Sequence, residues 1–154
     1  MIRLMSSLSA LGFLLVGILI GAFFFMDTQP RSLIPVRPCD RCLVHAELLG
    51  LIGSVIVQKT PRILPIVLET DFNVVIEHPL KKEELHFVVI PKKDIKSAGD
   101  FSAGDEPYIT DAFAIMRNLI EEHHMDKYRI VTNGPGYQQV NYLHFHLTGI
   151  PDES

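Results

Sequence analysis

The stretch YRIVTNGPGYQQVNYLHFHLTG (residues 128–149) carries the pattern that decides the fold. Its two ends are rich in β-branched and aromatic residues, whereas its middle, GPGYQQ, has the composition of a loop. Near the second end, His144 and His146 alternate with apolar residues. In a strand, this alternation places both imidazoles on one face and the apolar side chains on the other. The stretch therefore predicts two strands joined by a loop, with two histidines on the same side of the second strand.

Four further elements precede this stretch. The segments PIVLET (65–70), FNVVIEH (72–78) and HFVVIPKK (86–93) are rich in Val and Ile, as strands are. After them, apolar residues recur every three or four positions from Ile109 to Ile120, which indicates a helix with one buried face. The order predicts an α+β fold with an antiparallel sheet of about five strands and one main helix.

Length and charge narrow the classes of function. The chain has 154 residues, room for about one domain, and a net charge of −4. Because no basic stripe runs along it, a nucleic-acid polymer is disfavoured as a partner. A single nucleotide remains compatible, since backbone dipoles can hold a phosphate without a basic surface.

The N-terminal part of the chain is strongly apolar. Residues 8–26, LSALGFLLVGILIGAFFFM, form an uncharged run of 19 residues, close to the roughly 20 that cross a bilayer. We expect residues 1–27 to form a transmembrane helix that anchors the chain. A cleaved signal peptide is the alternative. Its best cleavage site follows Ala22, but Ile20 fits that site poorly and the apolar run continues beyond it.

The charges beside this run bear on its orientation. Cations are more numerous after the run than before it, with Arg31, Arg37 and Arg41 against Arg3. The positive-inside rule then favours a single-pass protein with its C-terminal domain on the cytoplasmic side of the membrane.

Residues 28–61 lie between the apolar run and the remaining domain, 62–154. They contain a proline-rich linker, a Cys-x-x-Cys pair and a helix over residues 46–57 that is apolar nearly all round. That helix is too short to span a bilayer. It is expected to be buried in the protein, to lie in the membrane interface or to dock on another protein.

Two histidines on one face of a strand suit phosphoryl transfer. A neutral imidazole can attack phosphorus, and hydrogen-bond donors in the neighbouring loop can stabilise the charge on the phosphoryl oxygens. Two alternatives stay open for His144 and His146. They are half-exposed residues of a sheet without a chemical role, or they are two ligands of a zinc ion.

The arrangement of these segments resembles the histidine triad (HIT) family of nucleotide hydrolases and transferases. HFVVIPKKDI (86–95), a helix and then residues 128–149 carry the resemblance, which covers residues 64–149. The hallmark of the family is three histidines that alternate with apolar residues in the last core strand. The resemblance implies an α+β domain that pairs into a homodimer and binds a purine nucleotide, whose α-phosphate is attacked.

The resemblance also implies roles for individual residues. His144 would be the nucleophile that forms a nucleotidyl-histidine, and His146 would bind phosphate oxygens or the leaving group. The remaining nucleotide contacts would come from a phosphate-binding asparagine, a donor loop and an acidic ribose ligand: Asn133, Gln138, Gln139 and Glu77.

The chain departs from the family pattern near the triad. The first of the three histidines is replaced by Tyr142, whose phenol can form hydrogen bonds but does not normally titrate near neutral pH. The loop before it is shorter than in typical members, and Tyr137 stands where glycine is common. Both differences bear on whether a phosphate can approach the site.

Cys39 and Cys42 form the Cys-x-x-Cys pair. In HIT proteins a comparable pair binds zinc together with the histidine that matches His86, so the resemblance implies a structural zinc site. Tyr142 occupies the place of the fourth ligand that such a site normally needs. A disulfide, if the domain faces an oxidising compartment, or a pair with neither role, are the alternatives. The chemistry at His144 requires no cofactor.

Two functions remain open. The first is a membrane-tethered HIT-type hydrolase or transferase that acts on a nucleoside phosphoramidate or a dinucleoside polyphosphate. The second is a HIT-fold structural or regulatory accessory subunit, bound to an integral-membrane protein and with little or no catalysis. The retained nucleophile favours the first, and Tyr142 and the apolar helix favour the second.

Overall fold

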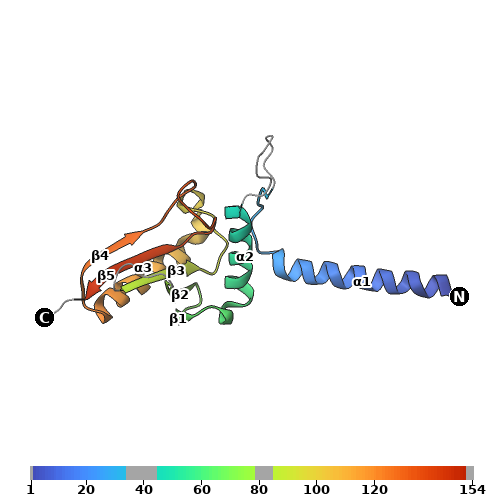
Figure 1. Ribbon diagram of the computed structural model, residues 1–154, viewed down its shortest axis with the longest axis horizontal. Coiled ribbons are helices and arrows are strands. Elements are labelled where there is room, and N and C mark those ends of the chain that lie inside the picture. Colours follow the sequence, from blue (N-terminus) through green and yellow to red (C-terminus); the bar gives the residue numbers. More distant parts are fainter. Residues whose placement is uncertain (1, 34–44, 79–84, 152–154) are drawn as a thin grey trace.

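The computed structural model describes residues 2–33, 45–78 and 85–151, with side chains from residue 10 onward. The α+β fold and the five-stranded antiparallel sheet predicted from the sequence are confirmed (Figure 1). The helices are α1 (Ile2–Phe25), α2 (His45–Lys59) and α3 (Glu106–Glu122). The strands are β1 (Ile66–Glu69), β2 (Asn73–Glu77), β3 (Leu85–Pro91), β4 (Met125–Val131) and β5 (Phe145–Pro151).

The last strand in sequence lies inside the sheet. The strand order is β1-β2-β3-β5-β4, so β5 has a hydrogen-bonded neighbour on each side. His146 lies opposite Val88 of β3 and opposite Val131 of β4. Because both neighbours fix the backbone of β5, His146 lies in a constrained part of the sheet, whereas His144, which the sequence placed on the same strand, lies one residue before it.

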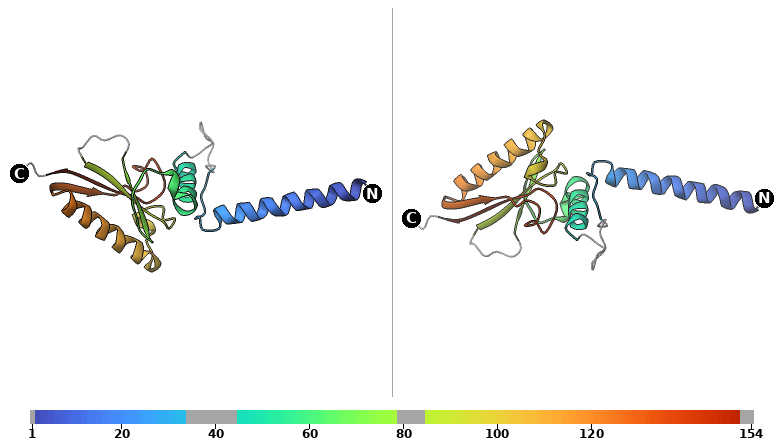
Figure 2. Two further views of the ribbon diagram at one scale, coloured as in Figure 1. Left: turned by 90° about the horizontal axis from the view of Figure 1, so that it is seen from below. Right: turned by 90° about the horizontal axis from the view of Figure 1, so that it is seen from above.

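Helix α3 covers one face of the sheet (Figure 2). Its apolar side chains recur at helical spacing and pack against every second residue of β2, β3 and β5, as the alternation predicts. The buried core on this face consists of Val75, Phe87, Val89, Ile95, Ala112, Ile115, Met116, Leu119, Met125, Leu143, Phe145 and Leu147. These contacts leave the intervening residues, including His144 and His146, for the opposite face.

Helix α2 packs on one end of that opposite face. Val57 is buried there with Val74 and Tyr142 in a second apolar cluster. A close approach of the backbones is possible because residue 50 is glycine, since a Cβ atom there would lie 2.3 Å from the carbonyl oxygen of Asn141. Of the three expected environments of this helix, the structure shows burial against the protein's own domain for one side, with Gly50, Ser54 and Val57, whereas Leu49 and Ile52 are each 46% exposed.

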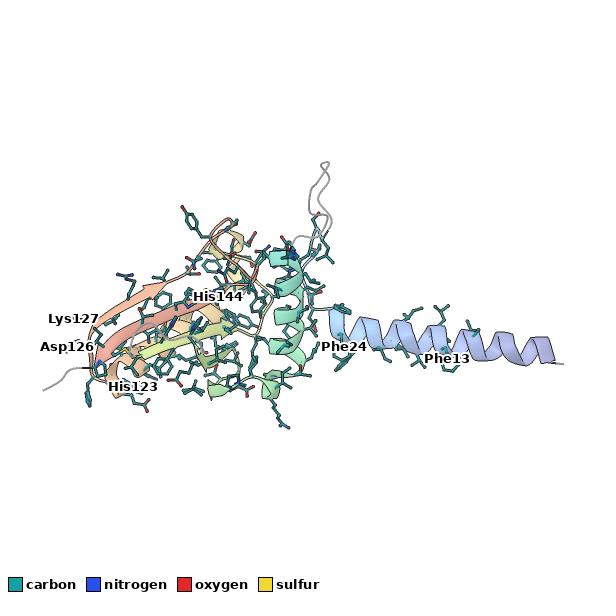
Figure 3. The ribbon with its side chains drawn as sticks, viewed as in Figure 1. Phe13, Phe24, His123, Asp126, Lys127 and His144 are labelled. Carbon is teal, nitrogen blue, oxygen red and sulfur yellow. The ribbon has the colours of Figure 1, made fainter. Side chains whose placement is uncertain are left out.

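Helix α1 projects away from the sheet (Figures 1 and 3). Phe13, labelled in Figure 3, is 79% exposed, and the side chain of Met26 just beyond the helix is 73% exposed. Within the part of the chain that the structure describes, no helix has both the length and the apolar character that crossing a membrane requires. The predicted transmembrane helix is therefore not found among these residues.

The segment that follows α1 returns to the domain through a buried ion pair. The Arg31 guanidinium donates from Nη1 and Nη2 to the two carboxylate oxygens of Asp94, over 2.5 and 2.7 Å. Their side chains are 2% and 1% exposed. The backbone N–H of Gln29 also donates to Asp94, over 2.7 Å. The chain before α2 is thus fixed to the loop that follows β3.

Candidate active site

The ring of His144 is oriented by the backbone just before β5. Its Nδ1 atom lies 2.7 Å from the carbonyl oxygen of Tyr142, which can only accept a hydrogen bond. Nδ1 therefore carries the proton, and Nε2 carries the lone pair. The hydroxyl of Thr132 donates to the carbonyl of His144 over 2.9 Å and fixes the same residue from β4's end. When the imidazole is neutral, this tautomer places the nucleophilic lone pair on Nε2.

Three more histidines, His146, His86 and His78, continue from His144 as a series of neighbouring rings. The rings of His144 and His146 are 4.8 Å apart and nearly perpendicular. Nδ1 of His146 lies 2.9 Å from Nε2 of His86 on β3, and His78 stacks on His86 at 4.3 Å. The expectation that His144 and His146 lie on one face is confirmed, because both line the same pocket. A proton gained by the His146–His86 pair would supply positive charge where a phosphoryl group develops negative charge.

Tyr142 lies on the same face but serves a different purpose. Its ring is 3% exposed and packs against Val57 of α2, while its hydroxyl donates to the carbonyl of Pro91. Burial, together with the nearby Asp94 carboxylate, raises the pKa of the Tyr142 phenol well above its ordinary value. The phenol therefore stays neutral and acts as a fixed donor and as a packing group for α2.

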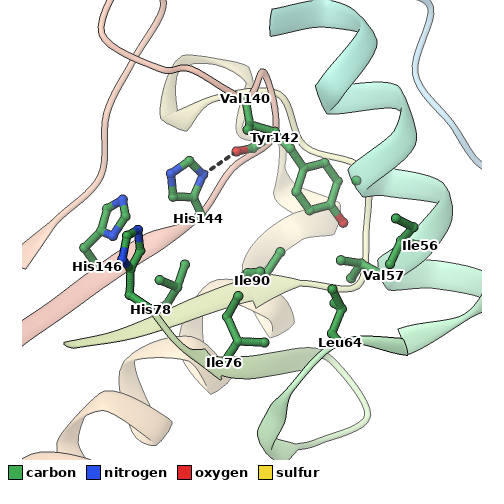
Figure 4. Close-up of a pocket in the computed structure, with 12 residues that line it drawn as sticks. Ile56, Val57, Leu64, Ile76, His78, Ile90, Val140, Tyr142, His144 and His146 are labelled. Atoms are coloured by element: carbon green, nitrogen blue, oxygen red, sulfur yellow. Dashed lines mark hydrogen bonds between the residues drawn. The ribbon is translucent and has the colours of Figure 1, made fainter. Parts of the chain in front are cut away.

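A pocket of about 290 Å³ opens in front of these residues (Figure 4). The three histidines at one end are His78, His144 and His146, and the other end is apolar. The remaining lining residues are Gly53, Ile56, Val57, Leu64, Ile76, Val88, Ile90, Val140 and Tyr142. The pocket thus offers imidazoles to a phosphoryl group at one end and an apolar surface to an organic group at the other.

The other predicted nucleotide contacts lie outside this lining, so far as the described residues show. The Nε2 atom of Gln138 donates to the carbonyl of Lys96, Asn133 is half-buried in the loop, and Gln139 is exposed. Glu77 pairs with Phe87, whose side chain belongs to the face that α3 covers. The neighbouring His78 takes the place in the pocket that was predicted for Glu77.

Sequence reasoning missed His78 and the contribution of α2. The signal for His78 was its position next to Glu77 at the end of a strand, where a shift of one residue exchanges the two faces. The lining residues of α2, among them Gly53 and Val57, had no local signal, because an apolar helix does not show which surface it covers.

Most of the predicted zinc site lies outside the residues that the structure describes. Cys39 and Cys42 lie outside the described residues, whereas His86 is part of the histidine cluster. Among the described residues, no group of three or more His, Cys, Asp or Glu side chains could hold a metal ion. Zinc at the cysteine pair stays a prediction.

The strand order, helix α3 on one face and the histidines at the start of β5 define a HIT-like domain. The solved HIT family hydrolase from Legionella pneumophila superposes with a TM-score of 0.58 at 23% identity, covering 67% of this chain and 95% of that one. The HIT family hydrolase from Clostridium thermocellum gives 0.57 at 24%, covering 67% and 92%. At these identities the two structures support the fold.

The family follows from the sequence matches. Residues 55–154 match the family model described as "Scavenger mRNA decapping enzyme C-term binding", and the chain belongs to that family. It is also 30% identical over 86 residues to an uncharacterized HIT-like protein of Chlamydia muridarum, covering 54% of this chain and 68% of that protein. The resemblance to the HIT family stated from the sequence is thus confirmed.

Proposed function

We propose that the protein is a HIT-type hydrolase or transferase in which Nε2 of His144 attacks the α-phosphate of a nucleotide conjugate. The observation that carries the proposal is the 2.7 Å contact between Nδ1 of His144 and the carbonyl of Tyr142. In the neutral ring, this contact places the proton on Nδ1 and leaves the lone pair on Nε2. This contact uses the backbone of Tyr142, so it does not depend on the histidine that the family has at that position.

The reaction would take place in two displacements. In the first, the lone pair of Nε2 forms a bond to phosphorus as the bond to the leaving group breaks, and His146 donates a proton to that group or stabilises the phosphoryl oxygens. In the second, water attacks phosphorus and loses a proton to His146, the P–N bond breaks with its electron pair returning to Nε2, and the nucleoside monophosphate leaves. The apolar end of the pocket would hold the base. No cofactor takes part in these steps.

The proposal is tested on the full chain in mild detergent. Purified protein is incubated with a nucleoside phosphoramidate, a dinucleoside polyphosphate and, because the family is named for an mRNA decapping enzyme, a cap dinucleotide. Wild-type protein is expected to release nucleoside monophosphate from at least one of them. His144→Asn is expected to abolish release and to remove the nucleotidyl adduct detected by mass spectrometry on the peptide that contains residue 144.

The matched control is His124→Asn. His124 follows α3 with φ of 49°, a conformation that asparagine tolerates, and it does not line the pocket. Full activity is expected in this variant. Release of nucleotide by folded His144→Asn at the wild-type rate would remove His144 from the mechanism.

An accessory role at a membrane is the second candidate, and one observation favours it. The described side chains of α1 are largely exposed although they are apolar, with Leu19 69% exposed in addition to Phe13. Such a surface is typical of membrane or protein contact. We propose that α1 attaches the domain to a membrane, on its cytoplasmic side. Flotation of the full chain with liposomes, against a Leu15→Lys, Leu19→Lys variant, tests this. Equal flotation would contradict it.

A further inference from the structure

The residue directly before Tyr142 is held by two segments that lie outside the core of the fold. The backbone N–H of Asn141 donates to the carbonyl of Ala46 over 2.9 Å, and its side-chain amide donates to Glu47 at the start of α2. Its carbonyl accepts a hydrogen bond from Nη2 of Arg31, over 3.1 Å. Three polar groups of Asn141, its backbone N–H, its carbonyl and its side-chain NH2, thus bind residues that precede position 55, where the family match begins.

Arg31 joins these contacts into one cluster. Besides Asn141, its guanidinium binds both oxygens of Asp94, and its Nε lies 3.6 Å from Glu47. Because its side chain is 2% exposed, these partners replace the water that would otherwise solvate the charge. Lysine could not reproduce this set, since an ammonium lacks the planar fork that reaches a carboxylate and a carbonyl together.

The cluster continues into the nucleophile. Asn141 is bonded to Tyr142 through the peptide, and the carbonyl of Tyr142 fixes the Nδ1 proton of His144. On the other side of Asp94, the carbonyl of Ile95 accepts from the N–H of Leu143, so the peptide that follows Tyr142 is held by the same loop. The orientation of the Tyr142 carbonyl is thus set from both sides by groups that Arg31 and Asp94 anchor.

We propose that Arg31 is a positioning residue for His144. Through Asn141 it sets the carbonyl of Tyr142, which selects the His144 tautomer with a free Nε2. This inference rests on the proposed function, because it assumes that His144 is the nucleophile. It also makes the segment between α1 and α2 part of the active-site frame, although that segment lies outside the region that matches the family.

The test measures the tautomer of His144 directly. In ¹⁵N NMR spectra of the full chain in detergent, the wild-type His144 ring is expected to show a protonated Nδ1 and an unprotonated Nε2, with signals assigned by their loss in His144→Asn. Arg31→Met is expected to mix the two tautomers. Its kcat for the phosphoramidate is expected to fall by about 10- to 100-fold, since a displacement of about 1 Å can have that effect, while KM changes little.

Lys59→Met is the matched control. Lys59 also pairs with a carboxylate that follows α1, Asp27 at 2.6 Å, but it has no contact with Asn141. In Lys59→Met, the His144 tautomer and the kcat are expected to equal those of the wild-type protein. If Arg31→Met does not fold, Arg31→Lys takes its place and is expected to show the same changes to a smaller extent.

The outcomes separate the two proposals. A folded Arg31 variant with the wild-type tautomer and kcat would overturn the positioning role, whatever the enzyme does. An unchanged tautomer with a lower kcat would also overturn it, because Arg31 would then act by another route. A wild-type chain that turns over none of the nucleotides would contradict the proposed function, and the NMR comparison would still decide whether Arg31 sets the ring of residue 144.

Discussion

Replacement of Gly50 by alanine is expected to destabilise the protein, although alanine favours helices. Gly50 lies within α2 and faces the backbone of Asn141. An added Cβ atom would lie 2.3 Å from the carbonyl oxygen and 2.8 Å from the carbonyl carbon of that residue, whereas ordinary contacts begin at 3.4 Å. Because both contacts are with backbone atoms, no side-chain rotation relieves them, and α2 must move away from the sheet.

The size of the effect follows from what that movement disrupts. Overpacking of this kind costs about 1–3 kcal/mol. The displacement also weakens the hydrogen bonds from Asn141 to Ala46 and Glu47, each with a net contribution of about 1 kcal/mol. Alanine returns about 0.5–1 kcal/mol through its higher helix propensity. We therefore expect the free energy of unfolding to fall by about 2 kcal/mol, and Tm by about 5–10 °C.

Gly53→Ala provides the comparison within the same helix. A Cβ atom there would have Val140 Cγ1 as its nearest neighbour, at 3.9 Å, so the same propensity gain is expected without a clash. Urea titrations of both full-length variants, followed by tyrosine emission because the chain has no tryptophan, give the two free energies. A Gly50→Ala protein as stable as Gly53→Ala would refute the close approach of α2 to Asn141.

Two further predictions concern pH. Tyr142→Phe leaves the carbonyl of Pro91 without its donor and is expected to lower the free energy of unfolding by about 1–2 kcal/mol. Since burial raises the pKa of Tyr142, the folded state keeps a proton that the unfolded chain loses, and the stability of the wild-type protein therefore falls above about pH 10. The Tyr142→Phe variant is expected to lack this part of the decrease. Urea titrations of both proteins at several pH values measure the difference. Desolvation opposes ionisation of Asp105, but hydrogen bonds from Lys93 and Ser102 outweigh it and lower the pKa. The stability that this carboxylate contributes is lost as pH falls below about 4, and acid titrations followed by circular dichroism should show a weaker dependence in Asp105→Asn.

The part of the fold that depends on local pattern could be predicted from the sequence. Side chains of a strand alternate whatever the strand pairs with, so the alternation around Phe145 was enough to assign both faces of β5. The amphipathic spacing likewise located α3 to within a few residues. The position of α2 was not predictable, because its contacts depend on the shape of the face formed by Val74 and Tyr142, which are brought together only by the folded sheet.

The site shows the same division. His144 and His146 line the same pocket, as the sequence predicted, although β5 begins at Phe145 and His144 directly precedes it. His78 lines the pocket and Glu77 does not, because the facing of a residue at a strand end depends on pairing with β3, which one sequence does not show. The nucleotide contact of Glu77 stays a prediction. The ion pair between Arg31 and Asp94 spans 63 positions in the chain, and no local pattern connects two charges at that separation.

Tyr142 couples two features of the sequence: the residue at position 142 and the residues of α2 that pack against it. Its ring fills the space against Val57 and Val74, and its hydroxyl satisfies Pro91. A related protein with histidine at position 142 would have a smaller, more polar ring in an apolar site. Helix α2 would then lose part of the surface against which it packs. Lineages that differ at this one codon should consequently also differ along the inner face of α2, and the two positions should covary.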